Sequence, residues 1–212
     1  FDLDQLRRLS VDLEVGGSTL TVMTGLSQAS RWPEVSTQKL DEIIQIAALE
    51  FDYVLLDVAA GLEANIGSLD AGFERNAITR WAIANSNTVV AICGADPVAI
   101  ARHLDAMSGV GEMRPIGEVL TVVNRLRNSV LGLSAKQQII ETLSGLGQLQ
   151  VAGFIPDDPA AADAALKASI SMSLVRRSSQ ARLAIALFTK NKILGERNGL
   201  DRRLFRPVAK LG

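Results

Sequence analysis

A single acidic residue, Asp57, ends an apolar run and is followed by small residues and a glycine, Gly61. The run, residues 53–58 (YVLLDV), has the composition of a buried β-strand. A carboxylate at a strand end can hold Mg²⁺ directly or through water, and a nearby glycine lets the backbone approach a phosphate group. These residues predict a magnesium–phosphate site, although an aspartate that only caps a loop would give the same pattern.

Two later apolar runs also end in polar residues. Asn124 and Arg125 close one of them, and the Asn amide can pair with the edge of adenine while the Arg guanidinium can stack on a base. Pro156 and Asp157 follow the other run, where a stiff turn and a carboxylate can wall a base pocket. Each pair alone also fits an ordinary turn or helix cap. The prediction of a nucleotide site therefore depends on their order at successive strand exits.

The elements that position these residues are short, continuously apolar runs that alternate with helix-like segments. Continuous apolar character is typical of parallel strands covered on both faces. The alternation predicts an α/β fold, with a doubly wound, mostly parallel sheet and helices on both faces, whose ligands bind beyond the carboxyl ends of the strands. The expected strands are 18–24, 53–58, 88–93, 119–124 and 150–155. The expected helices are 37–49, 75–86, 97–108, 134–145, 159–168 and 179–192.

Composition narrows the class of protein. The 212 residues are 48% hydrophobic but only 4% aromatic, so the core must be aliphatic. We expect no signal peptide and no spanning helix, since no apolar run is long enough to cross a bilayer, and one cysteine, Cys93, fits a reducing cytosol. Cys93 is expected to be a small buried group, and the single histidine, His103, to lie on a helix surface without a metal site. These features predict a cytoplasmic protein.

Charge is distributed unevenly along the chain. Residues 176–212 carry a net charge of +8, whereas the preceding residues carry −9. In residues 200–211, Leu and Val recur at helical spacing among basic residues, which is typical of a short amphipathic helix on an anionic membrane, although Pro207 would kink it. A partner protein and plain solvation remain alternatives, and nucleic acid ranks below them because no DNA-reading motif is present. We expect one domain, 1–192, followed by a basic tail, 193–212.

The motifs DYVLLDVAAGLE, VVNR and GFIPDD, in that order, resemble the MinD/ParA group of P-loop ATPases, and LTVMTGLSQASRWPE narrows the resemblance to CpaE/TadZ-like proteins. The resemblance covers roughly residues 15–190. It implies ATP and Mg²⁺ as cofactors, with Asp57 organising the metal and the attacking water and Gly61 in the switch loop. It places Asn124 and Arg125 at the adenine, with Pro156 and Asp157 in the loop over the base.

The sequence departs from the family at the phosphate-binding loop. That loop requires K-G-G-x-G-K-[ST], because backbone N–H groups and a lysine must neutralise the phosphates, and none of the six lysines follows a glycine. The chain also begins with Phe1 rather than methionine. We therefore expect it to start downstream of the loop, and its own ATPase activity to be negligible. The alternative is a degenerate relative that kept the fold as a scaffold.

The expected function of the intact protein is an ATP-dependent switch. The resemblance implies a homodimer that forms with ATP and positions pilus, secretion, division or partitioning machinery, with a peripheral membrane contact through the tail as one option. The main rival is a pseudo-ATPase scaffold that dimerises without turnover. A metabolic enzyme of the same superclass, such as a dethiobiotin synthetase-like ligase, is a weaker alternative because no substrate-binding residues can be identified.

Overall fold

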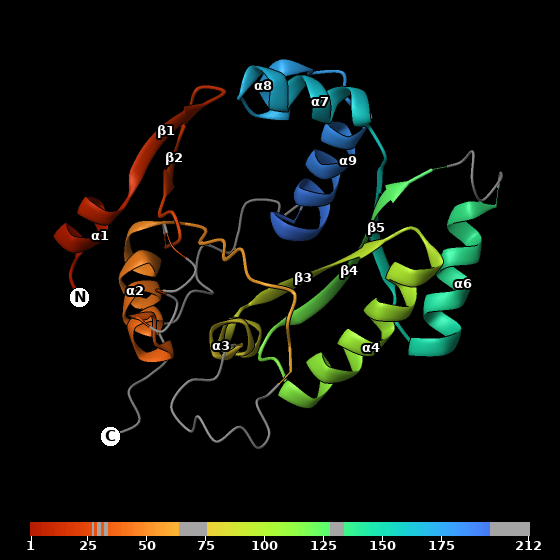
Figure 1. The fold of residues 1–212 in the computed structure, drawn as a ribbon, viewed down its shortest axis with the longest axis horizontal. Helices are drawn as coiled ribbons and strands as arrows, with labels where there is room; N and C mark the ends of the chain where they lie inside the picture. The colour runs from red at the N-terminus through yellow and green to blue at the C-terminus, as the bar shows by residue number, and fades with distance from the viewer. Residues whose placement is uncertain (27, 29–30, 32–33, 64–75, 128–133, 196–212) are drawn as a thin grey trace.

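The centre of the molecule is a three-stranded parallel sheet with strand order β3-β4-β5 (Figure 1). The computed structural model describes residues 1–195 except 27, 29–30, 32–33, 64–75 and 128–133; residues 196–212 also lie outside the described part. Helices flank the sheet, which confirms the predicted α/β class. The three strands are β3 (Thr88–Gly94), β4 (Glu118–Leu126) and β5 (Val151–Pro156).

The central strand β4 is the most deeply buried of the three. It pairs with the whole length of β3, from Thr88 opposite Glu118 to Gly94 opposite Asn124. Val122 and Val123 in its middle are 1% and 0% exposed. Such continuous burial requires cover on both faces of the sheet, which is why the strand has an unbroken apolar sequence.

Helices α4 (Pro97–Met113) and α6 (Ala135–Gly147) cover one face of the sheet. Helix α4 begins where the expected helix 97–108 begins: Pro97 occupies its first turn, and the N-cap Asp96 accepts a hydrogen bond from Ala99 N. The aliphatic core lies between this face and the two helices. Its buried members are Cys93, Val123, Leu126, Ala135, Ile139 and Leu143.

Helix α9 (Gln180–Phe188) covers β5 on the other face of the sheet (Figure 1). The contact is close because residue 153 of β5 is a glycine. A Cβ added to Gly153 would lie 3.0 Å from a ring carbon of Phe188. The glycine therefore lets the aromatic ring rest on the strand backbone. A π-helical turn, Thr189–Ile193, continues α9.

One carboxylate, that of Asp158, links two helix starts. It caps α7 (Pro159–Ala168) through Ala161 N, and it also accepts hydrogen bonds from Ser179 Oγ at 2.7 Å and Gln180 N at 3.1 Å, where α9 begins. The hydrogen bond from Ser179 holds the pKa of Asp158 below its usual value. The short helix α8 (Met172–Val175) lies between α7 and α9 in the chain.

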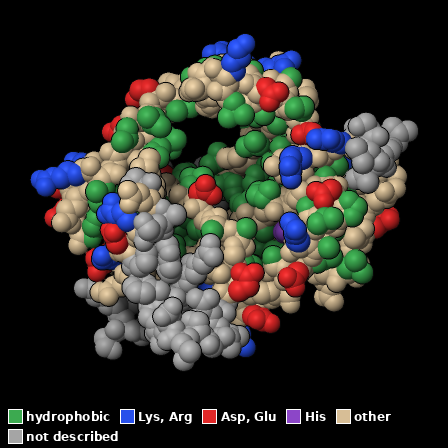
Figure 2. Space-filling view, viewed as in Figure 1, with side chains coloured by type: hydrophobic (Ala, Val, Ile, Leu, Met, Phe, Trp, Pro, Cys, Tyr) green, Lys and Arg blue, Asp and Glu red, His purple; other side chains and the backbone are tan. Residues whose placement is uncertain are grey.

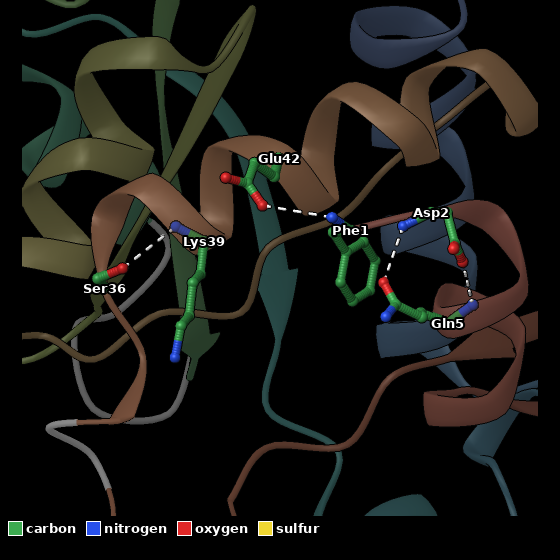
Figure 3. Close-up of polar contacts among 6 residues, drawn as sticks. All are labelled: Phe1, Asp2, Gln5, Ser36, Lys39 and Glu42. Carbon is green, nitrogen blue, oxygen red and sulfur yellow. Dashed lines mark hydrogen bonds and ion pairs between the residues drawn. The ribbon is translucent and has the colours of Figure 1, made fainter.

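The elements that precede β3 in the chain lie beside the sheet, and the last of them, α3, packs against α4 (Figure 1). Figure 3 shows local contacts of the first ones: Asp2 and Gln5 form a capping box, Ser36 caps the second helix, and Glu42 lies 3.6 Å from the backbone nitrogen of Phe1. The elements are α1 (Leu3–Leu9), β1 (Val11–Val15), β2 (Ser18–Val22), α2 (Thr37–Glu50) and α3 (Ala77–Asn85).

Two strand predictions need correction. The expected strand 18–24 exists as β2, but it pairs antiparallel with β1 in a hairpin whose turn is Gly16–Gly17, both with positive φ, and it is not part of the parallel sheet. Residues 53–58 form no strand with any described residue. An apolar sequence gives a segment the capacity for a strand, but the ladder requires a neighbouring backbone.

The six helix predictions are confirmed in position, and Cys93 is buried as expected, with 1% exposure. The prediction for His103 is wrong. Its side chain is 7% exposed, and its Nε2 lies 3.2 Å from Oγ1 of Thr121 on β4. The residue occupies the sheet-facing side of α4, where a hydroxyl on the adjacent strand satisfies the ring nitrogen.

Burial lowers the pKa of His103 below its usual value. The unfolded chain therefore takes up the proton more readily, and we expect the free energy of unfolding to fall as pH drops through about 6.5 towards the folded-state pKa. His103→Gln keeps a polar partner for Thr121 but does not titrate. Urea unfolding at about pH 7.5 and about pH 5 should show a smaller loss of stability for this variant than for the wild type. Equal losses would show that another group is responsible.

Candidate functional site

The carboxyl ends of β4 and β5 bring four of the predicted site residues together. Leu126 is paired with Pro156, and the backbone N–H of Asp157 donates to the Leu126 carbonyl at 3.0 Å. The register between the two strands shifts between Val123 and Leu126. This bulge contains Asn124 and Arg125, and bulges of this kind re-aim side chains at the end of a strand.

Arg125 has a left-handed backbone, with φ of 55°. This conformation is unfavourable for a residue with a Cβ and persists only where the surroundings fix it. Two hydrogen bonds do so here: Arg125 N donates to Oδ1 of Asn124 at 2.8 Å, and Ala95 N donates to the Asn124 carbonyl at 3.1 Å. The Nδ2 donor of Asn124 has no partner among the described residues, so it is available to a ligand.

Gly94, at the end of β3, lies beside this bulge. A Cβ added to it would come within 2.7 Å of Ala99 Cβ on α4 and 3.6 Å of Nη2 of Arg125. The absence of a side chain thus lets the start of α4 pack against the strand, and it places the Arg125 guanidinium beside the strand end. The thiol of Cys93, one residue earlier, is inert, because burial raises its pKa to about 11.

Asp157 forms an ion pair with Arg127, which is not among the predicted site residues. Arg127 Nε donates to its Oδ2 in an ion pair between the first residues beyond β4 and β5. The Asp157 side chain is 17% exposed, whereas that of Arg127 is 60% exposed. The sequence could have indicated this ion pair. Arg127 and Asp157 have opposite charges and follow two neighbouring parallel strands, whose carboxyl ends meet at one edge of the sheet.

The other predicted pair, Asp57 and Gly61, lies on a different segment. Asp57 is exposed and makes no hydrogen bond or ion pair with the described residues. A Cβ added to Gly61 would lie 2.7 Å from Oδ1 of Asn76. Hydrogen bonds from Thr79 to the Ala59 carbonyl and from Arg80 to the Leu62 carbonyl hold this loop against α3. Among the described residues, no hydrogen bond or ion pair links this loop to the carboxyl ends of β4 and β5. We therefore treat the candidate site as two halves, one at Asp57 and one at the β4–β5 exit.

The donor sets of the two halves suit different parts of a nucleotide. The half at Asn124 and Arg125 offers an amide and a planar guanidinium, which fit a purine base. The half at Asp57 offers one exposed carboxylate, a ligand type that Mg²⁺ accepts when water and phosphate oxygens complete its shell. Within the described ranges, no group of three or more His, Cys, Asp or Glu side chains is placed to hold a metal.

A parallel sheet with helices on both faces and polar residues at its strand exits defines the class of doubly wound α/β folds, and solved structures share this architecture. The ParA family ATPase from Chlorobium tepidum superposes with a TM-score of 0.69 at 16% identity, covering 89% of this chain and 70% of that one. The MinD cell division protein of Aquifex aeolicus gives 0.62 at 17% identity, covering 95% and 78%. These likenesses show the fold.

Sequence comparison gives a match within the same group. No family model matches the chain. Over 125 residues it is 27% identical to the septum site-determining protein MinD of Synechocystis, a match that covers 58% of this chain and 41% of MinD. The chain is therefore homologous to the MinD/ParA-family ATPases. The narrower CpaE/TadZ-like resemblance stays a prediction.

The left-handed backbone at Arg125 leads to a stability prediction. Arg125→Gly and Arg125→Ala both remove the guanidinium, but only glycine adopts positive φ without a Cβ clash. We expect the glycine variant to be more stable than the alanine variant by about 0.5–1 kcal/mol, measured by urea unfolding. An alanine variant of equal or greater stability would show that the bulge relaxes in solution.

Proposed function

We propose that the chain forms the base-binding end and the magnesium side of an ATP-dependent positioning protein. The observation that carries the proposal is the bulge at the β4 exit, where Asn124 and Arg125 are fixed beside the Asp157 loop. Its homology to MinD/ParA-family ATPases gives the site a nucleotide context. Because the chain spans 41% of the MinD sequence it matches, the activity of the whole protein is part of the proposal.

At the base end, Asn124 would hold adenine: its Nδ2, unpaired among the described residues, would donate to a ring nitrogen, and the second lone pair of its Oδ1 would accept from the amino group. Arg125 stacks its guanidinium on the base. Pro156 and Asp157 form the wall, and Arg127 holds the Asp157 carboxylate so that the wall keeps its position. This donor and acceptor pattern favours adenine over guanine, since guanine presents an oxygen where adenine presents an amino group.

At the metal end, Asp57 holds Mg²⁺ directly or through water, and Gly61 allows the switch loop to approach the terminal phosphate. Bound Mg²⁺ neutralises charge on the phosphate oxygens and so favours phosphoryl transfer. The chain has no K-G-G-x-G-K-[ST] sequence, and a phosphate-binding loop must come from polypeptide outside residues 1–212 for hydrolysis to occur.

The proposed output is positional. ATP-dependent pairing of two copies places pilus, secretion, division or partitioning machinery at a cellular site, and hydrolysis releases the pair. Among the described residues, no helix combines the length and apolarity needed to cross a bilayer. The basic amphipathic segment 200–211, proposed as a peripheral membrane contact, lies outside the described residues.

Removal of the Asp57 carboxylate tests the proposal. In the protein expressed from its complete coding sequence, we expect Asp57→Ala to fold normally but to lose ATP-dependent dimerisation, measured by light scattering with Mg²⁺ and ATP. Asp52→Ala is the matched control, because Asp52 is an exposed carboxylate in the same segment and has no proposed ligand. Wild-type dimerisation by the Asp57 variant would contradict the assigned role.

Calorimetry with ATP, ADP and GTP separates the proposed switch from its rival. Binding of ATP in preference to GTP, weakened by at least about tenfold in Asn124→Ala, supports the switch. A protein that binds none of these nucleotides and dimerises in their absence is the pseudo-ATPase scaffold, which has the fold but no nucleotide hydrolysis.

A further inference from the structure

An ion pair between Arg127 and Asp157 lies at the proposed base end, where β4 and β5 end. Figure 2 shows basic and acidic side chains side by side in this region, at the upper right of the view, where the two strands end in Figure 1. The strand ends are already joined by backbone pairing of Leu126 with Pro156. Because the Arg127 side chain is 60% exposed, the ion pair adds little to the stability of the fold. Its main effect is on the Asp157 carboxylate.

One oxygen of the Asp157 carboxylate is occupied and the other is open. Oδ2 accepts from Nε of Arg127, whereas Oδ1 has no hydrogen-bond partner among the described residues. The backbone N–H of Asp157 donates to the Leu126 carbonyl at 3.0 Å, which fixes the residue at the strand exit. With 17% of its side chain exposed, Asp157 therefore presents a ligand with one acceptor oxygen, whose charge is offset by the adjacent guanidinium.

Adenine and guanine differ in how they pair with a carboxylate. On its Watson–Crick edge, guanine has a ring N–H beside an amino group, so it offers two parallel donors that match the two oxygens of a free carboxylate. Adenine has one amino group beside a ring nitrogen that is an acceptor, so it can use only one carboxylate oxygen. Hydrogen bonds to an ionised carboxylate are roughly twice as strong as neutral ones. A free aspartate in a base-binding loop therefore favours guanine.

The amide of Asn124 is not sufficient to reverse this preference. Its Oδ1 accepts from Arg125 N at 2.8 Å, so the amide is held in one orientation. That orientation suits adenine, but guanine loses only one neutral hydrogen bond there. Two charge-assisted hydrogen bonds to a free Asp157 would outweigh such a loss. Selection of adenine requires that one oxygen of this carboxylate be kept from guanine.

We propose that Arg127 is a specificity-determining residue, which prevents guanine from pairing with both oxygens of Asp157 by occupying one of them. This role rests on the proposed function, because it requires the base to lie at the β4–β5 exit. With Arg127 in place, Oδ1 of Asp157 accepts one hydrogen bond from the adenine amino group. Guanine leaves one of its two donors without an acceptor, and a site rejects a ligand strongly when a desolvated polar group stays unpaired.

Removal of the Arg127 guanidinium tests this role in the protein expressed from its complete coding sequence. Arg127→Met keeps a long side chain but has no hydrogen-bond donor. We expect it to raise the affinity for GTP relative to that for ATP by at least about tenfold, measured by calorimetry with Mg²⁺. Arg102→Met is the matched control, because Arg102 is an exposed arginine on α4 with no proposed ligand, and it should leave the ratio unchanged.

A second substitution identifies the carboxylate as the cause. In the double variant Arg127→Met/Asp157→Asn, the side chain at position 157 has only one acceptor oxygen, so we expect the gain in relative GTP affinity to disappear. A gain that persists in the double variant overturns the proposal, because another group would then bind guanine.

The wild-type protein distinguishes this role from the proposed function. If it binds neither nucleotide, the proposed function is contradicted and the role of Arg127 is overturned with it. If it prefers ATP but Arg127→Met leaves the ratio of affinities unchanged, only the role of Arg127 is overturned. A wild-type protein without a preference for ATP also overturns this role. Circular dichroism checks that each variant is folded, and Arg127→Ala takes the place of Arg127→Met if that variant does not fold.

Discussion

The hydrogen-bonded ladder of β4 is the interaction on which the rest of the described structure depends. One edge of β4 pairs with β3 and the other with β5, and its middle residues are almost completely buried. The register of the ladder aligns the carboxyl ends of the three strands at one edge of the sheet. Helices α4, α6 and α9 pack against the faces of this sheet. The bulge at Asn124 and Arg125 interrupts this ladder at its end, so the strained conformation lies at the exits of the strands.

The two halves of the candidate site differ in how they are supported. The β4–β5 half is held by strand pairing, by the hydrogen bonds of Asn124 and Asp157, and by the ion pair from Arg127. Among the described residues, hydrogen bonds from α3 hold the Asp57 half at its downstream side, and Phe51 N donates to the Ala47 carbonyl at its upstream side. Homology to MinD/ParA-family ATPases is consistent with nucleotide binding at both halves. Only the β4–β5 half has its geometry fixed by contacts among the described residues.

Sequence reasoning located the helices, the parallel sheet and the strand exits, because apolar periodicity and caps such as Asp96–Pro97 are local signals. It assigned residues 53–58 to a strand because composition shows the capacity of a segment and not the presence of its partner. It misplaced His103 because one polar residue on an amphipathic helix gives no sign that Thr121 on a distant strand will satisfy it. The Arg127–Asp157 pair joins residues thirty positions apart, a distance set by the length of the intervening helix and strand.

Asp157 and Asp158 are consecutive in the chain, but their carboxylates bind different parts of the molecule. Asp157 is held by Arg127 beyond β4, whereas Asp158 accepts hydrogen bonds from Ser179 and Gln180 at the beginning of α9. One peptide unit therefore connects the loop after β5 to the beginning of α9. Because α7 and α9 begin at one shared carboxylate, the loop after β5 and the beginning of α9 are held in a fixed relation, and the chain continues from α9 into the basic π-helical turn Thr189–Ile193.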